Sequence, residues 1–259
     1  MKKVILLDMD GTITPARKPI EPSIISILNE ILDAGFYIGI VSGSSLEYMN
    51  EQLAPWGRWV KDCVKIHKYP VNGTQGLDMR GEYTGLEWDW LIHDIESADH
   101  RMRLSLGGQY IRKPENTIEY RGSAINWCPI GRDANDKQRE FFIHLDAAFK
   151  FRKNFMKQVK CRPLFHNKTV IKLGGQTSFD IYPRGWDKSY VFKDFESFER
   201  IYFIGDKCEP MGNDYEGYIL AGEFGLQTDG PSTTYRILSE ILKGSTSINK
   251  LSSPAATPT

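Results

Sequence analysis

The chain opens with a short apolar run that ends in two acidic residues. The segment Val4–Leu7 is followed directly by the sequence DMDGT at residues 8–12. An apolar run of this length, bounded by turn-forming residues, is typical of a buried strand. In an open parallel sheet, ligands bind beyond the carboxyl ends of the strands. The opening therefore predicts an α/β protein with a polar site where its first strand ends.

Further strand and helix patterns alternate along the first part of the chain and return near its end. Apolar residues recur at helical spacing over 24–32, a second strand is expected over 36–41, and Ser44 with Glu47 has the spacing of a capping box for a helix through Leu53. An apolar strand over 201–204 and a helix over 232–242 follow much later. This order predicts a Rossmann-like parallel sheet with right-handed crossovers.

The middle of the chain has a different pattern. Apolar and polar residues alternate over 117–121, 169–173 and 178–182, and an amphipathic helix is expected around 141–149. These elements predict an α+β cap inserted into the α/β core. We place the core at 1–80 and 185–245 and the cap at 81–184. The remaining residues, 246–259, are rich in Ser, Thr, Pro and Ala and are expected to form a disordered tail.

Composition and charge argue against several classes of protein. The chain has 33 basic and 33 acidic residues, whereas nucleic-acid binders usually carry a basic excess. We interpret the basic run 150–162 as a solvated helix face rather than a nucleic-acid contact. No apolar run is long enough to span a membrane. The four cysteines have no close pair, so they predict free thiols and a cytoplasmic protein rather than a zinc site or a disulfide framework.

The acidic residues favour phosphoryl chemistry with a metal ion. Asp8 and Asp10 repel each other unless a positive charge lies near them, and Mg²⁺ prefers oxygen ligands and bridges carboxylate to phosphate. Later loops supply Lys188, Asp206 and Asp214. A carboxylate can attack phosphorus and form an aspartyl phosphate. The alternative, a simple turn with helix-capping acids, is disfavoured by the apolar strand before the motif and the Gly-Thr after it.

At these residues the sequence resembles the haloacid-dehalogenase-like phosphotransferases. The sequence DMDGT is similar to their first motif, Ser42-Gly43 to the second, Lys188 to the third, and Gly205-Asp206 with Asn213-Asp214 to the fourth. Longer segments resemble the eukaryotic-type phosphomannomutase family. These are LLDMDGTITPAR, EYRGSAINWCPIGR, GGQTSFDIYPRGWDKSY and IYFIGDKCEPMGND. The chain departs from the family at Tyr215, Leu220 and Glu223, where the family usually has other residues.

The resemblance implies a role for each matched residue. Asp8 would be the nucleophile, Asp10 the general acid and base, and Lys188 the third catalytic residue. Mg²⁺ would be held by Asp8, the Asp10 carbonyl and Asp206, with Asn213 and Asp214 as the further residues of the metal-binding motif. The implied substrate-binding residues are Arg17, Ser42, Arg121, Arg132, Arg139, Ser178 and Asp180. The resemblance also implies a hexose 1,6-bisphosphate activator, a hexose phosphate substrate, and a homodimer formed through the caps.

Three functions follow from these residues. The first is a mutase that interconverts mannose 6-phosphate and mannose 1-phosphate for GDP-mannose synthesis. The second is a Mg²⁺-dependent sugar-phosphate phosphatase, in which water attacks the aspartyl phosphate. The third is a catalytically silent binding protein, which the presence of Asp8, Asp10, Lys188 and Asp206 disfavours. A mutase must grip the phosphate that is not transferred, and guanidinium groups suit that task because they bind phosphate bidentately and stay charged. Mannose and glucose remain alternative substrates.

Overall fold

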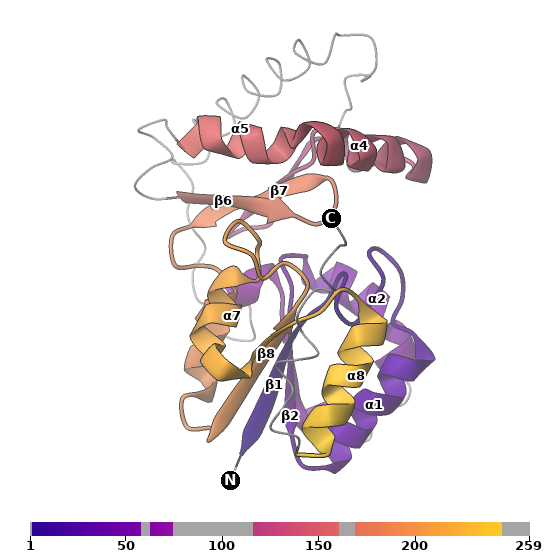
Figure 1. Cartoon of the computed structure of the whole chain (residues 1–259), viewed down its shortest axis with the longest axis vertical. Helices are drawn as coiled ribbons and strands as arrows, with labels where there is room; N and C mark the ends of the chain where they lie inside the picture. The colour runs from indigo at the N-terminus through magenta and orange to yellow at the C-terminus, as the bar shows by residue number, and fades with distance from the viewer. Residues whose placement is uncertain (1, 58–62, 75–115, 161–168, 245–259) are drawn as a thin grey trace, which may run out of the picture. The chain divides into compact units, whose positions relative to one another are not determined.

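The structure, a computed structural model, describes residues 2–57, 63–74, 116–160 and 169–244 (Figure 1). The chain divides into two compact units. The core unit comprises Met1–Arg80 and Arg184–Thr259, and the cap unit comprises Gly81–Pro183. The expected tail, 246–259, lies outside the described residues.

The core unit is built on a parallel five-stranded sheet in the order β3-β2-β1-β8-β9. The central strand, β1 (Lys3–Asp8), pairs with β2 (Tyr37–Val41) on one side and with β8 (Arg200–Gly205) on the other. The edge strands are β3 (Ile66–Tyr69) and β9 (Gly225–Gln227). The predicted Rossmann-like α/β core is confirmed, and β1 and β8 end side by side at the same edge of the sheet.

Helical segments cover both faces of this sheet (Figure 1). One face carries α1 (Pro22–Asp33), α2 (Leu46–Gly57) and α8 (Pro231–Leu242). The other carries the 3-10 segment η3 (Lys188–Phe195) and α7 (Tyr215–Ala221). Alternate residues of β1 pack against the helical layers on the two faces of the sheet, because successive strand residues point to opposite faces.

Ile5 and Leu7 of β1 belong to the apolar cluster shared with α1 and α8, whereas Val4 and Leu6 belong to the cluster shared with η3. Both clusters bury these side chains completely. Three short 3-10 segments complete the described core: η1 (Cys63–Lys65), η2 (Val71–Gly73) and η4 (Gly222–Phe224). Two-sided burial explains why β1 has a continuous apolar sequence.

The start of α2 differs from the sequence prediction by one residue. The backbone N–H of Tyr48 donates to Ser45 Oγ, so Ser45 caps the helix, and the predicted capping box of Ser44 and Glu47 was wrong. Ser44 instead lies in the turn after β2, where its N–H donates to Ser42 Oγ at 3.1 Å. The helix also continues through Pro55 to Gly57, beyond the predicted end at Leu53.

The cap unit contains a four-stranded antiparallel sheet in the order β4-β5-β7-β6. Its strands are β4 (Ile118–Tyr120), β5 (Ile125–Trp127), β6 (Thr169–Gly174) and β7 (Ser178–Pro183). Trp127 and Phe179 stack on one face, and Phe155 packs edge-on against Trp127. The cap therefore has the α+β composition predicted for it.

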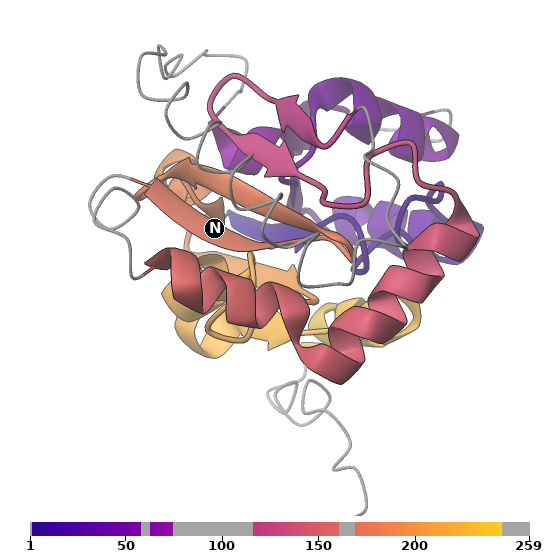
Figure 2. The same ribbon diagram turned by 90° about the horizontal axis from the view of Figure 1, so that it is seen from above.

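Two helices complete the described cap, α4 (Asp136–Phe149) and α5 (Phe151–Lys160). They meet at a bend, seen from above in Figure 2, where Lys150 has a left-handed backbone with φ of 50°. The basic run was predicted to be a solvated helix face, and this was wrong for Arg152. That side chain is buried, pairs with Asp146 at 2.7 Å, and donates to the Ser178 carbonyl at 3.1 Å.

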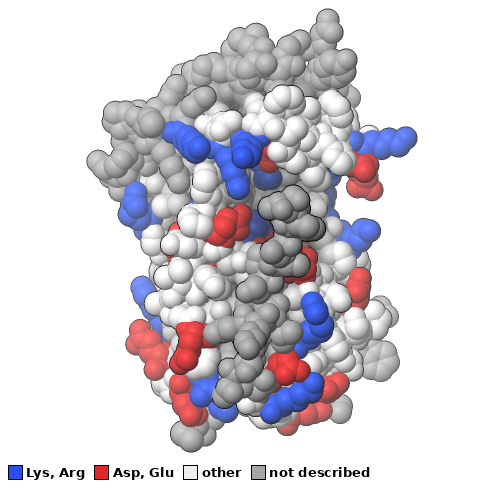
Figure 3. Space-filling view, in the orientation of Figure 1, with Lys and Arg blue, Asp and Glu red and all other residues white. Residues whose placement is uncertain are grey.

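Surface charge, cysteine burial and helix hydropathy can be compared with the predictions for the described residues. On the face shown in Figure 3, basic and acidic side chains are interspersed. Cys63 is exposed and Cys128 and Cys208 are buried, all three as free thiols, while Cys161 lies outside the described residues. In the described part of the chain, no helix combines the length and apolar character needed to cross a membrane.

Candidate functional site

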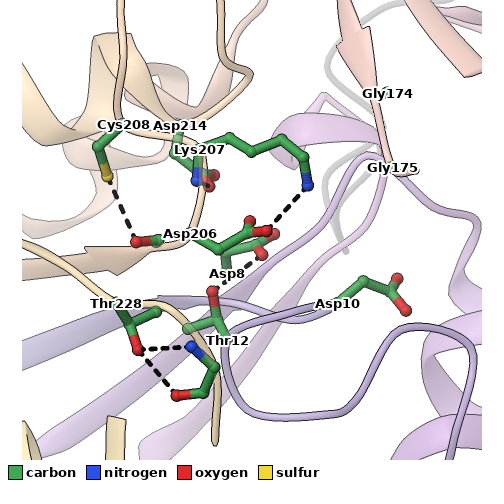
Figure 4. Close-up of polar contacts among 12 residues, drawn as sticks. Asp8, Asp10, Thr12, Gly174, Gly175, Asp206, Lys207, Cys208, Asp214 and Thr228 are labelled. Carbon is green, nitrogen blue, oxygen red and sulfur yellow. Dashed lines mark hydrogen bonds and ion pairs between the residues drawn. The ribbon is translucent and has the colours of Figure 1, made fainter. Parts of the chain in front are cut away.

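Three carboxylates meet at the carboxyl edge of the core sheet. Asp8 ends β1, Asp206 directly follows β8, and Asp214 precedes α7. One ligand oxygen from each lies within 4.8 Å of the others. Figure 4 shows the three side chains converging from these separate segments. The parallel pairing of β1 with β8 brings Asp8 and Asp206 together although they are far apart in sequence.

The glycine of the opening motif allows this close approach. Gly11 has φ of +86°, a conformation that side-chain-bearing residues rarely adopt. A Cβ at this position would lie 2.6 Å from Asp206 Oδ2. Next to it, Thr12 donates its hydroxyl to Asp8 Oδ2 at 3.1 Å. The DMDGT turn therefore both orients the first carboxylate and leaves room for the second.

Two lysines compensate the charge of the three acids. The Nζ of Lys188 is completely buried and donates to Asp8 Oδ1 and, at 2.6 Å, to Asp214 Oδ1. Lys207 donates from Nζ to Asp206 Oδ2 at 2.9 Å and from its backbone N–H to Asp214 Oδ2 at 2.9 Å. With all five groups ionised, the cluster keeps one net negative charge.

Burial and mutual repulsion give these acids different proton affinities. Burial, together with the charge of Asp214, raises the pKa of Asp8 to about 8 against the opposing effect of Lys188. Burial also raises the pKa of Asp206 to about 6, although Lys207 partly offsets this. For Asp214, burial acts to raise the pKa too, but the ion pair with Lys188, together with the backbone N–H and the charge of Lys207, outweighs it and the pKa is lowered. Burial opposes the charge of Lys188, but both acids raise its pKa.

This set of groups fits a hard divalent cation. Carboxylate oxygens are the ligands that Mg²⁺ prefers, and a cation would favour the charged forms of Asp8 and Asp206, whose pKa values are raised by burial and by repulsion from Asp214. A second observation points the same way. The side-chain oxygen of Asn213 is buried and has no hydrogen-bond partner, and the residue directly precedes Asp214.

Asp10 turns its side chain away from the three-acid cluster (Figure 4). Its Oδ1 accepts hydrogen bonds from the Tyr48 hydroxyl and from the backbone N–H of Arg17, both at 3.0 Å. The contact therefore uses the backbone of Arg17. Arg17 itself is exposed and has a positive φ of 61°. Ser42 is buried just beyond β2 and accepts from Ser44 N–H. These contacts fix Asp10 in an orientation that differs from that of Asp8.

A row of polar residues crosses one face of the cap sheet. The strand register pairs Glu119 with Asn126, Asn126 with Asp180, and Asp180 with Lys172. Directly paired residues of antiparallel strands share a face. The neighbouring row, Ile118, Trp127, Phe179 and Leu173, lies on the opposite face by the same register. The cap sheet therefore has one apolar face, and this polar row crosses the other.

Asn126 connects several predicted site residues within this row. Its Nδ2 donates to Asp180 Oδ1 at 2.7 Å and to Ser178 Oγ at 3.1 Å. Its Oδ1 accepts from Arg132 NH1 at 2.6 Å. Arg121 NH1 lies 3.8 Å from Asp180 Oδ1. Four of the residues implied by the resemblance are thus gathered around one asparagine that sequence reasoning did not single out.

Arg139 contacts the cap differently from the other two arginines. From α4 it donates to Thr177 Oγ1 at 3.0 Å, to the Ala134 carbonyl at 2.9 Å and to the Arg132 carbonyl at 3.1 Å. These bonds hold the loop that carries Arg132. The described contacts of Arg139 therefore support a positioning role beside the role in substrate binding that the resemblance implies.

Sequence reasoning missed five residues of these two clusters. They are Thr12, Tyr48, Lys207, Glu119 and Asn126. Glu119 and Asn126 carried a usable signal, because each is a polar residue between apolar neighbours in a short strand. Tyr48 carried no such signal, because its contact with Asp10 depends on the direction that α2 takes after β2.

Comparison with known proteins gives a consistent result. A family model described as eukaryotic phosphomannomutase matches residues 26–244. The chain is 33% identical to a phosphomannomutase of Drosophila melanogaster, over 93% of this chain and 95% of that protein. It is 32% identical to a phosphomannomutase of Encephalitozoon cuniculi, over 93% of this chain and 94% of the relative.

Solved structures share the fold at low sequence identity. One is an IMP-nucleotidase of Plasmodium falciparum bound to IMP, with a TM-score of 0.62 and 13% identity over 93% of this chain and 68% of that chain. Another is the C-terminal domain of a trehalose-6-phosphate phosphatase of C. albicans, with a TM-score of 0.56 and 14% identity over 94% and 92% of the two chains. At such identities the likeness concerns the fold alone.

Proposed function

The chain belongs to the eukaryotic phosphomannomutase family, and from this membership we propose that it interconverts mannose 6-phosphate and mannose 1-phosphate. It is accordingly an enzyme, an isomerase that moves a phosphoryl group within a hexose phosphate. The observation that carries the proposal is the buried constellation of Asp8, Lys188 and Asp214 at the end of β1, in a chain matched to the family across both units.

In the proposed mechanism, Asp8 receives the phosphoryl group from a hexose 1,6-bisphosphate. A carboxylate oxygen of Asp8 attacks phosphorus, the bond between phosphorus and the sugar oxygen breaks, and that oxygen takes a proton from Asp10. Thr12 and Lys188 hold the two oxygens of Asp8 in place. A bound monophosphate then gives its hydroxyl proton to Asp10 and attacks the aspartyl phosphate. This gives a sugar bisphosphate, which reorients. Its other phosphoryl group then passes to Asp8, the sugar oxygen takes the proton back from Asp10, and the isomeric monophosphate is released.

Asp10 suits the proton transfer because its orientation is fixed independently of Asp8. The Tyr48 hydroxyl and the Arg17 N–H both contact Oδ1. Ser42, buried at the end of the neighbouring strand, is proposed to donate its hydroxyl to the transferring phosphoryl group.

We propose that Asp8, Asp206, Asn213 and Asp214, with the Asp10 carbonyl, form the Mg²⁺ site. When bound, the cation supplies positive charge that favours ionised Asp8 and reduces repulsion between carboxylate and phosphate. Lys188, which is completely buried, neutralises two of the acids, Asp8 and Asp214.

The cap residues are proposed to bind the part of the substrate that does not react. Arg121, Arg132 and Arg139 anchor the second phosphate, while Ser178 and Asp180 contact the sugar. The polar face of the cap sheet supports this assignment, because it places Arg121, Ser178 and Asp180 together. A mutase needs such an anchor since either phosphate of the bisphosphate must be held while the other reacts.

The cellular location, the use of the product and the oligomeric state of the enzyme are also proposals. We propose a cytoplasmic enzyme that supplies mannose 1-phosphate for GDP-mannose synthesis and forms a homodimer through its caps. Exposed aromatic residues on α4 support the dimer, since Phe141 and Phe149 are 51% and 64% exposed. Size-exclusion chromatography with light scattering on the wild type and on a double Phe141→Ser and Phe149→Ser variant tests it.

Phosphorus NMR tests the proposed reaction directly. The purified chain is incubated with Mg²⁺, mannose 1-phosphate and a trace of glucose 1,6-bisphosphate. Growth of a sugar 6-phosphate signal that depends on the bisphosphate is expected. Growth of inorganic phosphate alone would contradict the mutase and assign a phosphatase. The same experiment with glucose 1-phosphate compares the two hexoses.

A further inference from the structure

Glu119 holds two of the arginines together. Its Oε2 accepts from Arg121 NH2 at 2.7 Å and Arg121 Nε at 3.1 Å, and the same oxygen lies 2.8 Å from Arg132 NH1. The two arginines come from different segments, since Arg121 directly follows β4 and Arg132 lies in the loop after β5. One carboxylate oxygen therefore connects two cationic groups that the backbone does not bring together by itself.

We propose that Glu119 is a positioning residue that assembles Arg121 and Arg132 into a single phosphate-binding unit. The inference rests on the proposed function and deepens it, because it says how the phosphate anchor is organised. Two guanidinium groups this close repel each other, so they need an anion between them before the substrate arrives. Glu119 supplies it. With Asp180, which lies 3.8 Å from Arg121 NH1, and Lys172, the strand partner of Asp180, the cluster keeps one net positive charge with which to attract a phosphate.

The position of Glu119 in the sheet supports a role in orientation. Its strand partner is Asn126, which itself accepts from Arg132 NH1 at 2.6 Å. The NH1 nitrogen of Arg132 is thus fixed from two adjacent strands. Because bidentate recognition of phosphate depends on the plane of the guanidinium group, such fixation lowers the entropy lost on binding.

A competing interpretation makes the opposite prediction. If Glu119 merely occupied the phosphate site, its removal would expose the arginines and tighten the binding of anions. If it positions the arginines, its removal lets them separate and weakens binding. The sign of the change in affinity therefore distinguishes the two roles.

The experiment measures binding and turnover on the full-length chain with Glu119→Gln. Calorimetry gives the Kd of mannose 1-phosphate without turnover, and a coupled assay gives KM and kcat. We expect Kd and KM to rise about tenfold, while kcat stays within about threefold, because the anchor binds ground and transition states alike. The matched control is Glu140→Gln, the same chemical change at an exposed position on α4, which should leave all three values unchanged.

Several results would overturn the proposal. These are an unchanged Kd and KM, tighter binding in Glu119→Gln, or a loss of kcat without a change in KM. If the glutamine variant does not fold, Glu119→Asp decides, because it keeps the charge but is too short to reach both guanidinium groups. A wild-type Kd in that variant would overturn the proposal. If the wild type itself binds mannose 1-phosphate but does not isomerise it, the proposed function fails while the positioning role stands or falls on Kd.

Discussion

Replacing Lys188 by methionine should destabilise the metal-free protein strongly. Lys188 is completely buried, and its two partners, Asp8 and Asp214, have side chains that are 7% and 0% exposed. Asp8 accepts a proton readily because burial and Asp214 raise its pKa to about 8. Asp214 is the costly partner. Without Lys188 it must stay charged in the interior or take up a proton.

The cost of protonation sets the magnitude. Protonating a carboxyl of ordinary pKa 3.8 at pH 7 costs about 4 kcal/mol, since each pH unit corresponds to about 1.4 kcal/mol. That value agrees with the roughly 3–5 kcal/mol lost when one partner of a buried ion pair is removed. At pH 5 the same protonation costs only about 2 kcal/mol. The variant should therefore be less destabilised at pH 5 than at pH 7.

The sign of this pH dependence follows from proton linkage. In the variant, the folded-state pKa of Asp214 lies above its unfolded value, so the folded state binds more protons and gains stability as the pH falls. In the wild type, the pKa of Asp214 is lowered, so its contribution is fully present above the unfolded pKa and is lost only in acid.

The assay is urea or thermal unfolding in EDTA at both pH values. A loss of about 4 kcal/mol corresponds to a Tm lower by roughly 8–16 °C in a chain of this size. Lys243→Met is the matched control, because Lys243 is 67% exposed and pairs with Glu240 on the surface. It should cost less than about 1 kcal/mol. If Lys188→Met were no more destabilised than this control, the buried lysine would not be neutralising the acids.

Changes at Asp10, at the metal-binding acids and at Arg152 should each have a measurable effect. Asp10→Asn should lower kcat by about a hundredfold or more and should slow the labelling of Asp8 by the bisphosphate to a similar degree, because Asp10 protonates the leaving sugar oxygen in that step. Rapid-quench labelling checks this, and labelling at the wild-type rate would contradict it. Binding of Mg²⁺ at pH 7 should release protons, because the raised pKa of Asp8 leaves this carboxyl protonated until the cation binds. Calorimetry in buffers of different ionisation enthalpy measures the number of protons released. A binding enthalpy that does not depend on the buffer would contradict the assignment of Asp8 as a metal ligand. Arg152→Met should lower Tm by several degrees and raise KM, since Arg152 holds the Ser178 carbonyl and pairs with Asp146, whereas Lys153→Met on the exposed side of α5 should change neither.

The core could be predicted from the sequence because its pattern is local. The apolar run of β1, the turn residues of DMDGT and the Gly-Asp after β8 each identify a strand end without reference to the rest of the chain. Parallel topology then brings Asp8 and Asp206 to one edge. The error at Ser44 was equally local. The turn after β2 uses Ser44 to contact Ser42, so the helix begins one residue later than the capping pattern predicted.

The cap was harder because its contacts depend on strand register. The pairs that form the polar row join β4 to β5, β5 to β7 and β7 to β6, and a shift of one residue would turn every side chain to the other face. Arg152 shows the same limit for helices. Its basic neighbours suggested a solvated face, but the carbonyls of the β6–β7 hairpin and the carboxylate of Asp146 satisfy its donors in the interior.

Exposure explains why the two charge clusters should respond differently to mutation. Lys188 and its partners are shielded from water, so an unpaired charge there is costly to the fold. In the cap, Glu119 and Arg132 are 33% and 37% exposed, so solvent can replace the contact between them, and Arg121, which is only 7% exposed, still lies 3.8 Å from Asp180 when Glu119 is neutralised. Removing a charge from the core should therefore appear first as lost stability, whereas removing Glu119 should appear as lost affinity in a protein that still folds.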